Sequence, residues 1–175
     1  MKFCPNCGAA VAQRVPPGDS LPRYVCDQCG EIHYQNPRVV VGSIPEFEGK
    51  LLLCRRAIEP RRGYWTLPAG VLELGESTEQ GALRETLEEA GARVALRGLY
   101  TLLNVVRVGQ VHLFYRAELL DIDFAPGPES LEVALFGVDE LPWEDLAFRT
   151  VTETLKRYVE ERPAGRFGVH CADIA

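Results

Sequence analysis

The segment that most constrains the fold is residues 70–92, GVLELGESTEQGALRETLEEAGA. Ser77 is followed three residues later by Gln80, which is the pattern of a helix-capping box. Gly91 stands where a left-handed residue would end the same helix. We therefore predict one helix between Ser77 and Gly91, preceded by a glycine-rich loop.

The two faces of this predicted helix differ in chemistry. At 100° per residue, an apolar stripe forms on one side from Leu83, Thr86, Leu87 and Ala90. The opposite side carries a small residue and three carboxylates: Gly81, Glu85, Glu88 and Glu89. We expect the apolar stripe to pack on a sheet and the carboxylates to point away from it, with space left beside Gly81.

Two interpretations of the carboxylate face are open. A solvated acidic face is the commoner case on helices, but such faces usually mix charges at i,i+4 spacing, and only Arg84 offers a nearby cation here. The preceding loop contains Gly70, Gly75 and Glu76. Clustered carboxylates beside a glycine-rich loop are typical of an oxygen-ligand site for Mg²⁺ or Mn²⁺, which would relieve the repulsion between them.

Length and charge limit the remaining possibilities. The 175 residues suffice for one ordinary domain with a small appendage, and the net charge of −6 disfavours a nucleic-acid-binding surface. No apolar run is long enough to span a membrane, and the start of the chain, MKFCPNCG, has no apolar signal core. We therefore expect a cytoplasmic protein with no membrane or nucleic-acid partner.

Four cysteines form two close pairs, Cys4-x-x-Cys7 and Cys26-x-x-Cys29, and a glycine follows each pair. Without a secretion signal, this spacing predicts a metal site before disulfides. Two such knuckles make a four-sulfur site that favours structural Zn²⁺, since no coordination position stays open. A redox dithiol pair or an iron site is the alternative.

The amino-acid composition of the chain changes after this cysteine-rich segment. Residues 1–35 contain few large aliphatic side chains, whereas residues 36–175 contain β-branched and aliphatic runs. Strands are predicted over 38–44, 50–56, 110–120 and 131–138, with a hairpin turn at 45–49 and a second helix over 149–162. These elements predict an α/β (α+β) domain with a mixed sheet flanked by helices.

Residues 70–92 resemble the signature of the Nudix hydrolases. The matching positions are Gly70, Glu76, Arg84, Glu85, Glu88, Glu89 and Gly91. The resemblance implies a Nudix α/β/α sandwich over residues 36–175, preceded by a zinc ribbon over residues 1–35.

The resemblance also implies roles for individual residues. Nudix enzymes hydrolyse nucleoside diphosphates linked to another group. The expected Mg²⁺ or Mn²⁺ ligands are Glu85, Glu88, Glu89 and the Gly70 carbonyl. Arg84 would orient Glu85 or its neighbours rather than touch substrate, and Glu76 would either bind metal through water or brace the loop.

The sequence does not decide which residue is the base that activates water. Glu88 and Glu89 are candidates inside the signature, and Glu129 and Glu132 are candidates outside it. Ordinary surface acids are the competing interpretation of the last two.

The sequence says less about the substrate. A zinc ribbon before a Nudix domain is similar to the NADH pyrophosphatases, but their Ser-Gln-Pro-Trp segment is absent, and Val108 stands where ADP-ribose pyrophosphatases typically carry proline. The stretches HYQNPR, GYWTLPAG, FAPGPESLE and LAF resemble a group related to plant FAD pyrophosphatases. That resemblance implies cleavage of FAD to FMN and AMP, with ADP-ribose as a second small-molecule nucleotide substrate, and a homodimer is expected. The alternative is a catalytically silent module that senses a nucleotide or binds RNA or protein.

Overall fold

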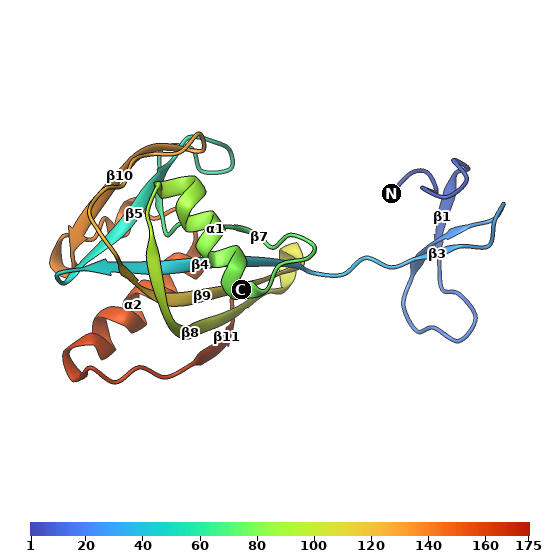
Figure 1. Cartoon of the computed structure of the whole chain (residues 1–175). Helices are drawn as coiled ribbons and strands as arrows, with labels where there is room; N and C mark the ends of the chain where they lie inside the picture. The colour runs from blue at the N-terminus through green and yellow to red at the C-terminus, as the bar shows by residue number, and fades with distance from the viewer. The chain divides into compact units, whose positions relative to one another are not determined.

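The computed structural model describes residues 1–175, which form two compact units, 1–37 and 38–175 (Figure 1). The first unit is a three-stranded antiparallel sheet of β1 (Val11–Arg14), β2 (Arg23–Cys26) and β3 (Ile32–His33). Its fold rests on short strands and turns, as its low content of large aliphatic side chains predicts.

The second unit is built around one eight-stranded sheet with two α-helices. Its strands are β4 (Arg38–Phe47), β5 (Lys50–Arg56), β6 (Trp65–Thr66), β7 (Ala69–Val71), β8 (Val94–Val105), β9 (Gln110–Leu119), β10 (Ser130–Gly137) and β11 (His170–Asp173). Its helices are α1 (Thr78–Ala90) and α2 (Arg149–Glu161), with short 3₁₀ turns at Val106–Val108, Val138–Glu140, Trp143–Asp145 and Arg162–Ala164. The predicted strand and helix segments are confirmed.

The sheet is mixed. Its strand order is β10-β5-β4-β9-β8-β11, with β6 paired to β5 and β7 paired to β4. Strand β4 runs parallel to β9 and antiparallel to β5, and β11 runs parallel to β8. The predicted hairpin turn is shorter than the expected 45–49, because residues 45–47 extend β4, and only Glu48 and Gly49, both at positive φ, join β4 to β5. Such a pair of residues matches the twist of the strands that it connects.

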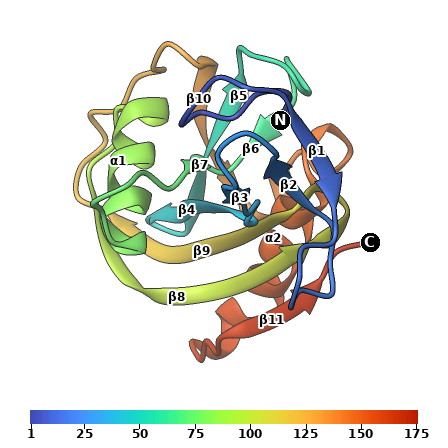
Figure 2. The same ribbon diagram turned by 90° about the vertical axis from the view of Figure 1, so that its right-hand side faces the viewer.

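The two helices cover opposite faces of the sheet (Figure 2). Ser43 of β4 places its hydroxyl oxygen 2.6 Å from that of Thr86 on α1. The next residue, Ile44, belongs to the buried cluster that contains Val151 and Leu155 of α2. Because successive side chains of a strand point to opposite faces, this alternation fixes the α/β/α sandwich that the sequence predicts.

The predicted orientation of α1 is wrong in part. Leu83 and Leu87 were expected to be buried, but they are 39% and 53% exposed. The buried residues of α1 are Gly81, Ala82, Glu85, Thr86, Glu89 and Ala90. The small residues on this side allow the helix to approach the sheet closely, so that two of the three carboxylates face inward.

Candidate active site

Helix α1 has the ends that its sequence predicts. The backbone N–H of Gln80 donates to the Ser77 hydroxyl at 3.2 Å, and the Gln80 side chain accepts from the Ser77 N–H at 2.8 Å. Gly91 has φ of 60° and donates its N–H to the Leu87 carbonyl. Both ends are thus fixed locally, which determines which residues of α1 face the loop before it.

Two carboxylates of α1 lie against β7. A Cβ atom on Gly70 would lie 2.3 Å from the carboxyl atoms of Glu85, so only glycine leaves room for that group. The neighbouring Ala69 donates its backbone N–H to Glu89 at 2.9 Å. The loop and the helix are therefore packed together through the carboxylates themselves.

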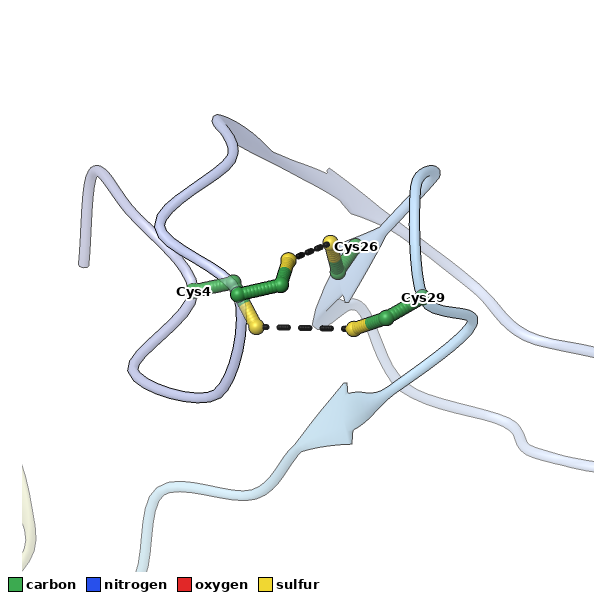
Figure 3. A group of neighbouring side chains, drawn as sticks. Cys4, Cys26 and Cys29 are labelled. Atoms are coloured by element: carbon green, nitrogen blue, oxygen red, sulfur yellow. Dashed lines mark hydrogen bonds between the residues drawn. The ribbon is translucent and has the colours of Figure 1, made fainter.

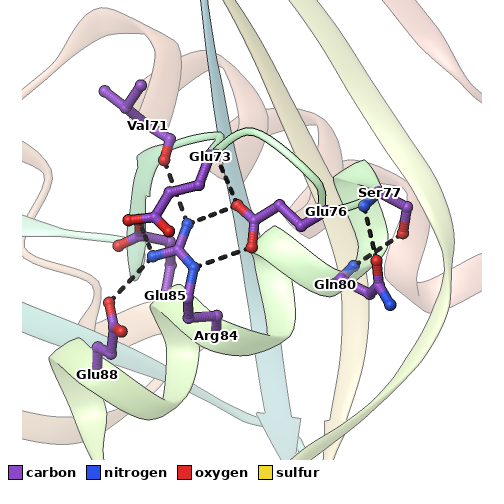
Figure 4. A network of polar contacts seen from close by, with 8 residues as sticks. All are labelled: Val71, Glu73, Glu76, Ser77, Gln80, Arg84, Glu85 and Glu88. Atoms are coloured by element: carbon purple, nitrogen blue, oxygen red, sulfur yellow. Dashed lines mark hydrogen bonds and ion pairs between the residues drawn. The ribbon is translucent and has the colours of Figure 1, made fainter.

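Arg84 connects the loop to the exposed edge of this cluster (Figure 4). Its guanidinium donates to Glu76 at 2.7 and 3.0 Å, to Glu85 at 2.7 Å and to Glu88 at 3.0 Å. It also donates to the Val71 carbonyl at 3.2 Å. The guanidinium thus bridges carboxylates of the loop and of the helix.

Glu76 is held on the loop side of this network. It accepts the backbone N–H of Glu73 at 2.8 Å as well as the two bonds from Arg84. The hydrogen bonds from Arg84 lower the pKa of Glu76 to about 2. Glu76 is therefore an ionised carboxylate that braces the loop against α1.

The pKa values of the two inward carboxylates shift in the opposite direction from that of Glu76. Burial raises the pKa of Glu85 above its ordinary value. Burial also raises the pKa of Glu89 to about 7, and the nearby charges of Glu85 and Glu129 add to the increase. Within the protein alone, this cluster has more negative charge than its cations compensate.

The loop over residues 124–130 brings a further carboxylate to the cluster. Ala125 donates its backbone N–H to the Ala90 carbonyl at 3.0 Å, and Gly127 donates to the Glu89 carbonyl at 3.0 Å. These bonds satisfy carbonyls at the C-terminal end of α1. They place Glu129 at the cavity that Glu85, Glu88 and Glu89 line.

Glu132 has a different position from Glu129. It lies in β10 opposite Arg55 of β5, and its carboxylate is 3.5 Å from the Arg55 guanidinium. Glu132 is absent from the residues that line the cavity. The register shift between Ser130 and Glu132 separates the two acids, and sequence alone gave no sign of it.

The cavity has a volume of about 800 Å³. Its wall combines carboxylates with apolar side chains that include Val40, Ile58, Pro60, Val71, Pro128 and Phe148. A cavity that offers both carboxylate and apolar surface suits a ligand that joins phosphates to an aromatic group.

Four polar residues of the cavity wall, Arg56, Glu73, Gln110 and His112, were missed in the sequence. The ring Nε2 of His112 lies 3.0 Å from the Gln110 side-chain oxygen. Burial lowers the pKa of His112 to about 4, so its ring is neutral near pH 7. Gln110 and His112 are two residues apart on β9, and this alternation is the only sequence signal that they share a face.

The four cysteines of the first unit come together, as their spacing predicts (Figure 3). Their sulfur atoms all lie within 4.8 Å of one another, with 3.7 Å between Cys4 and Cys29 and 3.5 Å between Cys7 and Cys26. A tetrahedral site with Zn–S bonds of about 2.3 Å requires sulfurs about 3.8 Å apart, so the group fits Zn²⁺. A backbone N–H bond from Cys29 lowers the pKa of Cys26 to about 7, which favours the thiolate that binds metal.

Comparison with known families agrees with this geometry. A family model described as the NUDIX domain matches residues 36–158, and one described as Nudix N-terminal, a zinc ribbon, matches residues 2–35. The chain belongs to the Nudix hydrolase family. The first match covers most of the first unit of this Nudix hydrolase, and the second match covers the second unit up to residue 158.

Individual relatives of this Nudix protein differ in how much they share with it. A crystal structure of a NUDIX hydrolase from Nitrosomonas europaea is 57% identical, with a TM-score of 0.97 and 99% of each chain covered. An ADP-ribose pyrophosphatase of Methanocaldococcus jannaschii is 30% identical over 62% of this chain and 67% of its own length. The NAD-capped RNA hydrolase NudC of Pseudomonas aeruginosa is 32% identical over 81% of this chain but only 49% of its own length. The chain therefore spans about half the length of that NudC protein.

Neither helix of this Nudix protein is long and apolar enough to cross a membrane.

Proposed function

We propose that this chain hydrolyses the diphosphate bond of a nucleoside diphosphate derivative with the help of Mg²⁺ or Mn²⁺. The observation that carries the proposal is the burial of Glu85 and Glu89 side by side against β7, where a protein without a ligand role would place apolar groups.

The residues around this cluster fit a divalent cation. The candidate ligands are the carboxylates of Glu85, Glu88 and Glu89 and the carbonyl of Gly70, all of them the oxygen donors that Mg²⁺ and Mn²⁺ prefer. Burial, with a smaller contribution from neighbouring carboxylates, raises the pKa values of Glu85 and Glu89, so their ionised forms need neutralisation that the protein supplies only in part. A bound cation would supply that neutralisation, attract the diphosphate and favour ionisation of the attacking water.

Arg84 and Glu76 act in this proposal as positioning residues. Arg84 is held by bonds to Glu76, Glu85 and Glu88, so it sets the carboxylates and does not contact substrate. A role for Glu76 as a ligand through water is compatible with its place in the loop, although bracing is the role that its bonds support.

Among the candidate bases, Glu129 is favoured over Glu132. Glu129 lines the same cavity as the α1 carboxylates, whereas Glu132 is paired with Arg55 outside it. Glu88 and Glu89 remain candidates in the same role. A base must reach the water that it deprotonates, and only residues at the cavity meet that condition.

Several substrates deserve direct comparison. The resemblance in sequence favours FAD, with ADP-ribose second. The names of the relatives add ADP-ribose and the NAD cap of RNA, although the NudC match covers only about half of that protein. In each of these a diphosphate joins adenosine to a second group, which agrees with a cavity whose wall offers both carboxylates and apolar side chains. We expected no nucleic-acid partner from the sequence. Because NudC relatives are named for their action on NAD-capped RNA, capped RNA is included among the substrates to be tested.

The test is a product analysis with matched variants. The protein is incubated with Mg²⁺ or Mn²⁺ and FAD, ADP-ribose, NADH or NAD-capped RNA, and the products are separated. We expect Glu89→Gln to lose most turnover and Glu132→Gln to retain it, with both proteins folded. If wild-type protein cleaves none of these substrates, the silent nucleotide-sensing or RNA- or protein-binding module becomes the better account.

Two further expectations belong to this proposal. The four-cysteine site would hold structural Zn²⁺, since its sulfurs leave no open coordination position. The homodimer is tested by light scattering of the whole chain at several concentrations.

A further inference from the structure

His33 contacts the four-cysteine cluster without being one of its sulfur donors. Its ring Nε2 lies 3.3 Å from the Sγ atom of Cys4, which is within the range of an N–H···S hydrogen bond. Cys4 is only 2% exposed, so little water reaches its sulfur. The cysteine spacing that predicts the cluster does not account for this contact.

The other three sulfurs of the cluster have backbone donors. The Cys7 sulfur bonds to the N–H of Ala9, the Cys26 sulfur to that of Cys29, and the Cys29 sulfur to that of Glu31. Bonds of this kind stabilise thiolates, because each N–H group directs a partial positive charge at the sulfur. His33 gives Cys4 a side-chain donor in the same role.

Metal binding decides which atom of the His33–Cys4 contact donates. In the free thiol, either the sulfur or the ring nitrogen can carry the shared hydrogen. A thiolate bound to Zn²⁺ has no hydrogen to give, so the bond then requires a hydrogen on Nε2. A neutral imidazole with its hydrogen on Nε2 is an ordinary tautomer, and its Nδ1 is then an acceptor.

The sheet of the first unit holds His33 in place. His33 is the last residue of β3 and pairs with Tyr24 of β2. The Cys26 N–H also donates to the Glu31 carbonyl at 2.9 Å, so the backbone connects the second cysteine pair to the start of β3. Because Cys4 belongs to the first pair, the His33 contact connects the end of β3 to the other half of the cluster.

We propose that His33 is a positioning residue of the zinc site, whose Nε2–H donates to the Cys4 thiolate and raises the affinity of the cluster for Zn²⁺. Four thiolates around one Zn²⁺ have an excess of negative charge, and a donor that points at a sulfur stabilises part of it. The inference rests on the expectation that the four cysteines hold zinc, and it adds a fifth residue on which the binding of that zinc depends.

Two substitutions of His33 separate a hydrogen bond from packing. His33→Gln keeps an N–H donor at a similar distance from the backbone but removes the ring. His33→Phe keeps an aromatic ring but has no donor. The matched control is Tyr34→Phe, because Tyr34 is the next residue, is 60% exposed and loses only its hydroxyl.

The first measurement is the zinc affinity of the whole chain, obtained by competition with a chromophoric chelator. We expect His33→Phe to weaken zinc binding by about 10- to 100-fold, as for the loss of other groups that hold metal ligands. His33→Gln should recover part of this loss, and Tyr34→Phe should bind as wild type does. Wild-type affinity in His33→Phe would overturn the inference, and so would a weaker affinity in His33→Gln than in His33→Phe, since packing would then explain the contact.

The second measurement reports on the sulfur itself. Co²⁺ can replace Zn²⁺ in a tetrahedral sulfur site, and its thiolate-to-cobalt charge-transfer absorption depends on how strongly each sulfur is stabilised. Loss of the N–H···S bond raises the energy of the sulfur electrons, so the band of His33→Phe should move to longer wavelength and that of Tyr34→Phe should not move. An unmoved band in His33→Phe would contradict the proposed bond.

The third measurement needs no substituted protein to fold. In zinc-loaded wild-type chain labelled with ¹⁵N, long-range ¹H–¹⁵N spectra should show the ring hydrogen of His33 on Nε2, with the signal assigned by its absence in His33→Gln. A hydrogen on Nδ1 alone would overturn the inference. If wild-type chain binds neither Zn²⁺ nor Co²⁺, this inference and the zinc expectation fall together, whereas loss of turnover in Glu89→Gln would still support the proposed hydrolysis.

Discussion

Gly70→Ala tests the geometry of the site through a single methyl group. The added Cβ would lie 2.3 Å from the Glu85 carboxyl atoms, whereas ordinary contacts of a Cβ begin at 3.4 Å. The difference, 3.4 − 2.3 = 1.1 Å, is the least distance by which the carboxylate must move. Gly70 lies outside the positive-φ region, so alanine fits its backbone without strain.

The size of the expected changes in stability and rate depends on which atoms move to make room for the new Cβ. The carboxylate is the end of a flexible side chain, and moving it off its rotamer costs about 1 kcal/mol, which lowers Tm by a few degrees. A displacement of about 1 Å in a catalytic group costs on the order of 100-fold in rate. We therefore expect a folded protein whose kcat/KM falls about 100-fold.

The assay pairs activity with stability. kcat/KM is measured with Mg²⁺ on the substrate that wild type cleaves fastest, and Tm is measured by calorimetry. Gly168→Ala is the control, because its nearest neighbour would be 3.9 Å from the new Cβ and its φ is not positive. Wild-type turnover in a folded Gly70→Ala protein would refute the reasoning. Loss of the fold would refute it equally, because the clash would then involve more than the Glu85 side chain.

Three other outcomes are expected. The folded-state pKa of Glu76 is about 2, below its ordinary value of 4.5, so its ionic bonds stabilise the protein above pH 4.5 and lose effect as pH falls toward 2. The Tm difference between wild type and Glu76→Gln should therefore shrink over that interval. A constant Tm difference would contradict the assignment of the pKa shift to the Arg84 bonds. Thr86→Val leaves the buried Ser43 hydroxyl without its partner at 2.6 Å and should destabilise by about 1–3 kcal/mol in urea unfolding, with a smaller loss in the double variant that also has Ser43→Ala. In buffer without Mg²⁺ or Mn²⁺, a strong chelator should raise hydrogen exchange in residues 1–37 and leave that of residues 38–175 unchanged, and protection that persists throughout 1–37 would argue against structural zinc.

The ends of α1 could be predicted because the information is local. Ser77, Gln80 and Gly91 form their bonds with residues at most four positions away, so spacing alone identifies them. The same holds for the cysteine knuckles, where each pair is joined by a tight turn.

The inward face of α1 could not be predicted because the hydrophobic pattern of a helix does not indicate which carboxylates are buried at a functional site. A pattern argument assigns Leu83 and Leu87 to the interior and the glutamates to solvent. The structure reverses this for Glu85 and Glu89, since Gly70 makes room for Glu85 and the Ala69 N–H donates to the Glu89 carboxylate. Those partners lie fifteen or more residues earlier in the sequence, where no periodicity within the helix can reveal them.

The separation of Glu129 from Glu132 depends on still longer-range contacts. The bonds of the 124–130 loop to Ala90 and Glu89, and the pairing of β10 with β5, decide which acid reaches the cavity. The Arg56 position depends equally on Pro60, Tyr64 and Phe148, which only the folded chain assembles.

The attachment of the 124–130 loop to α1 has a consequence for how such enzymes diversify. Its two bonds to the helix use only main-chain N–H groups, of Ala125 and Gly127, and a Cβ on Gly127 would lie 1.7 Å from the Glu88 carbonyl oxygen. One glycine is therefore irreplaceable, while the side chains around it can be exchanged without moving the anchor. Substitutions at Pro128, which lines the cavity beside this anchor, could thus change the cavity wall while the α1 carboxylates keep their places.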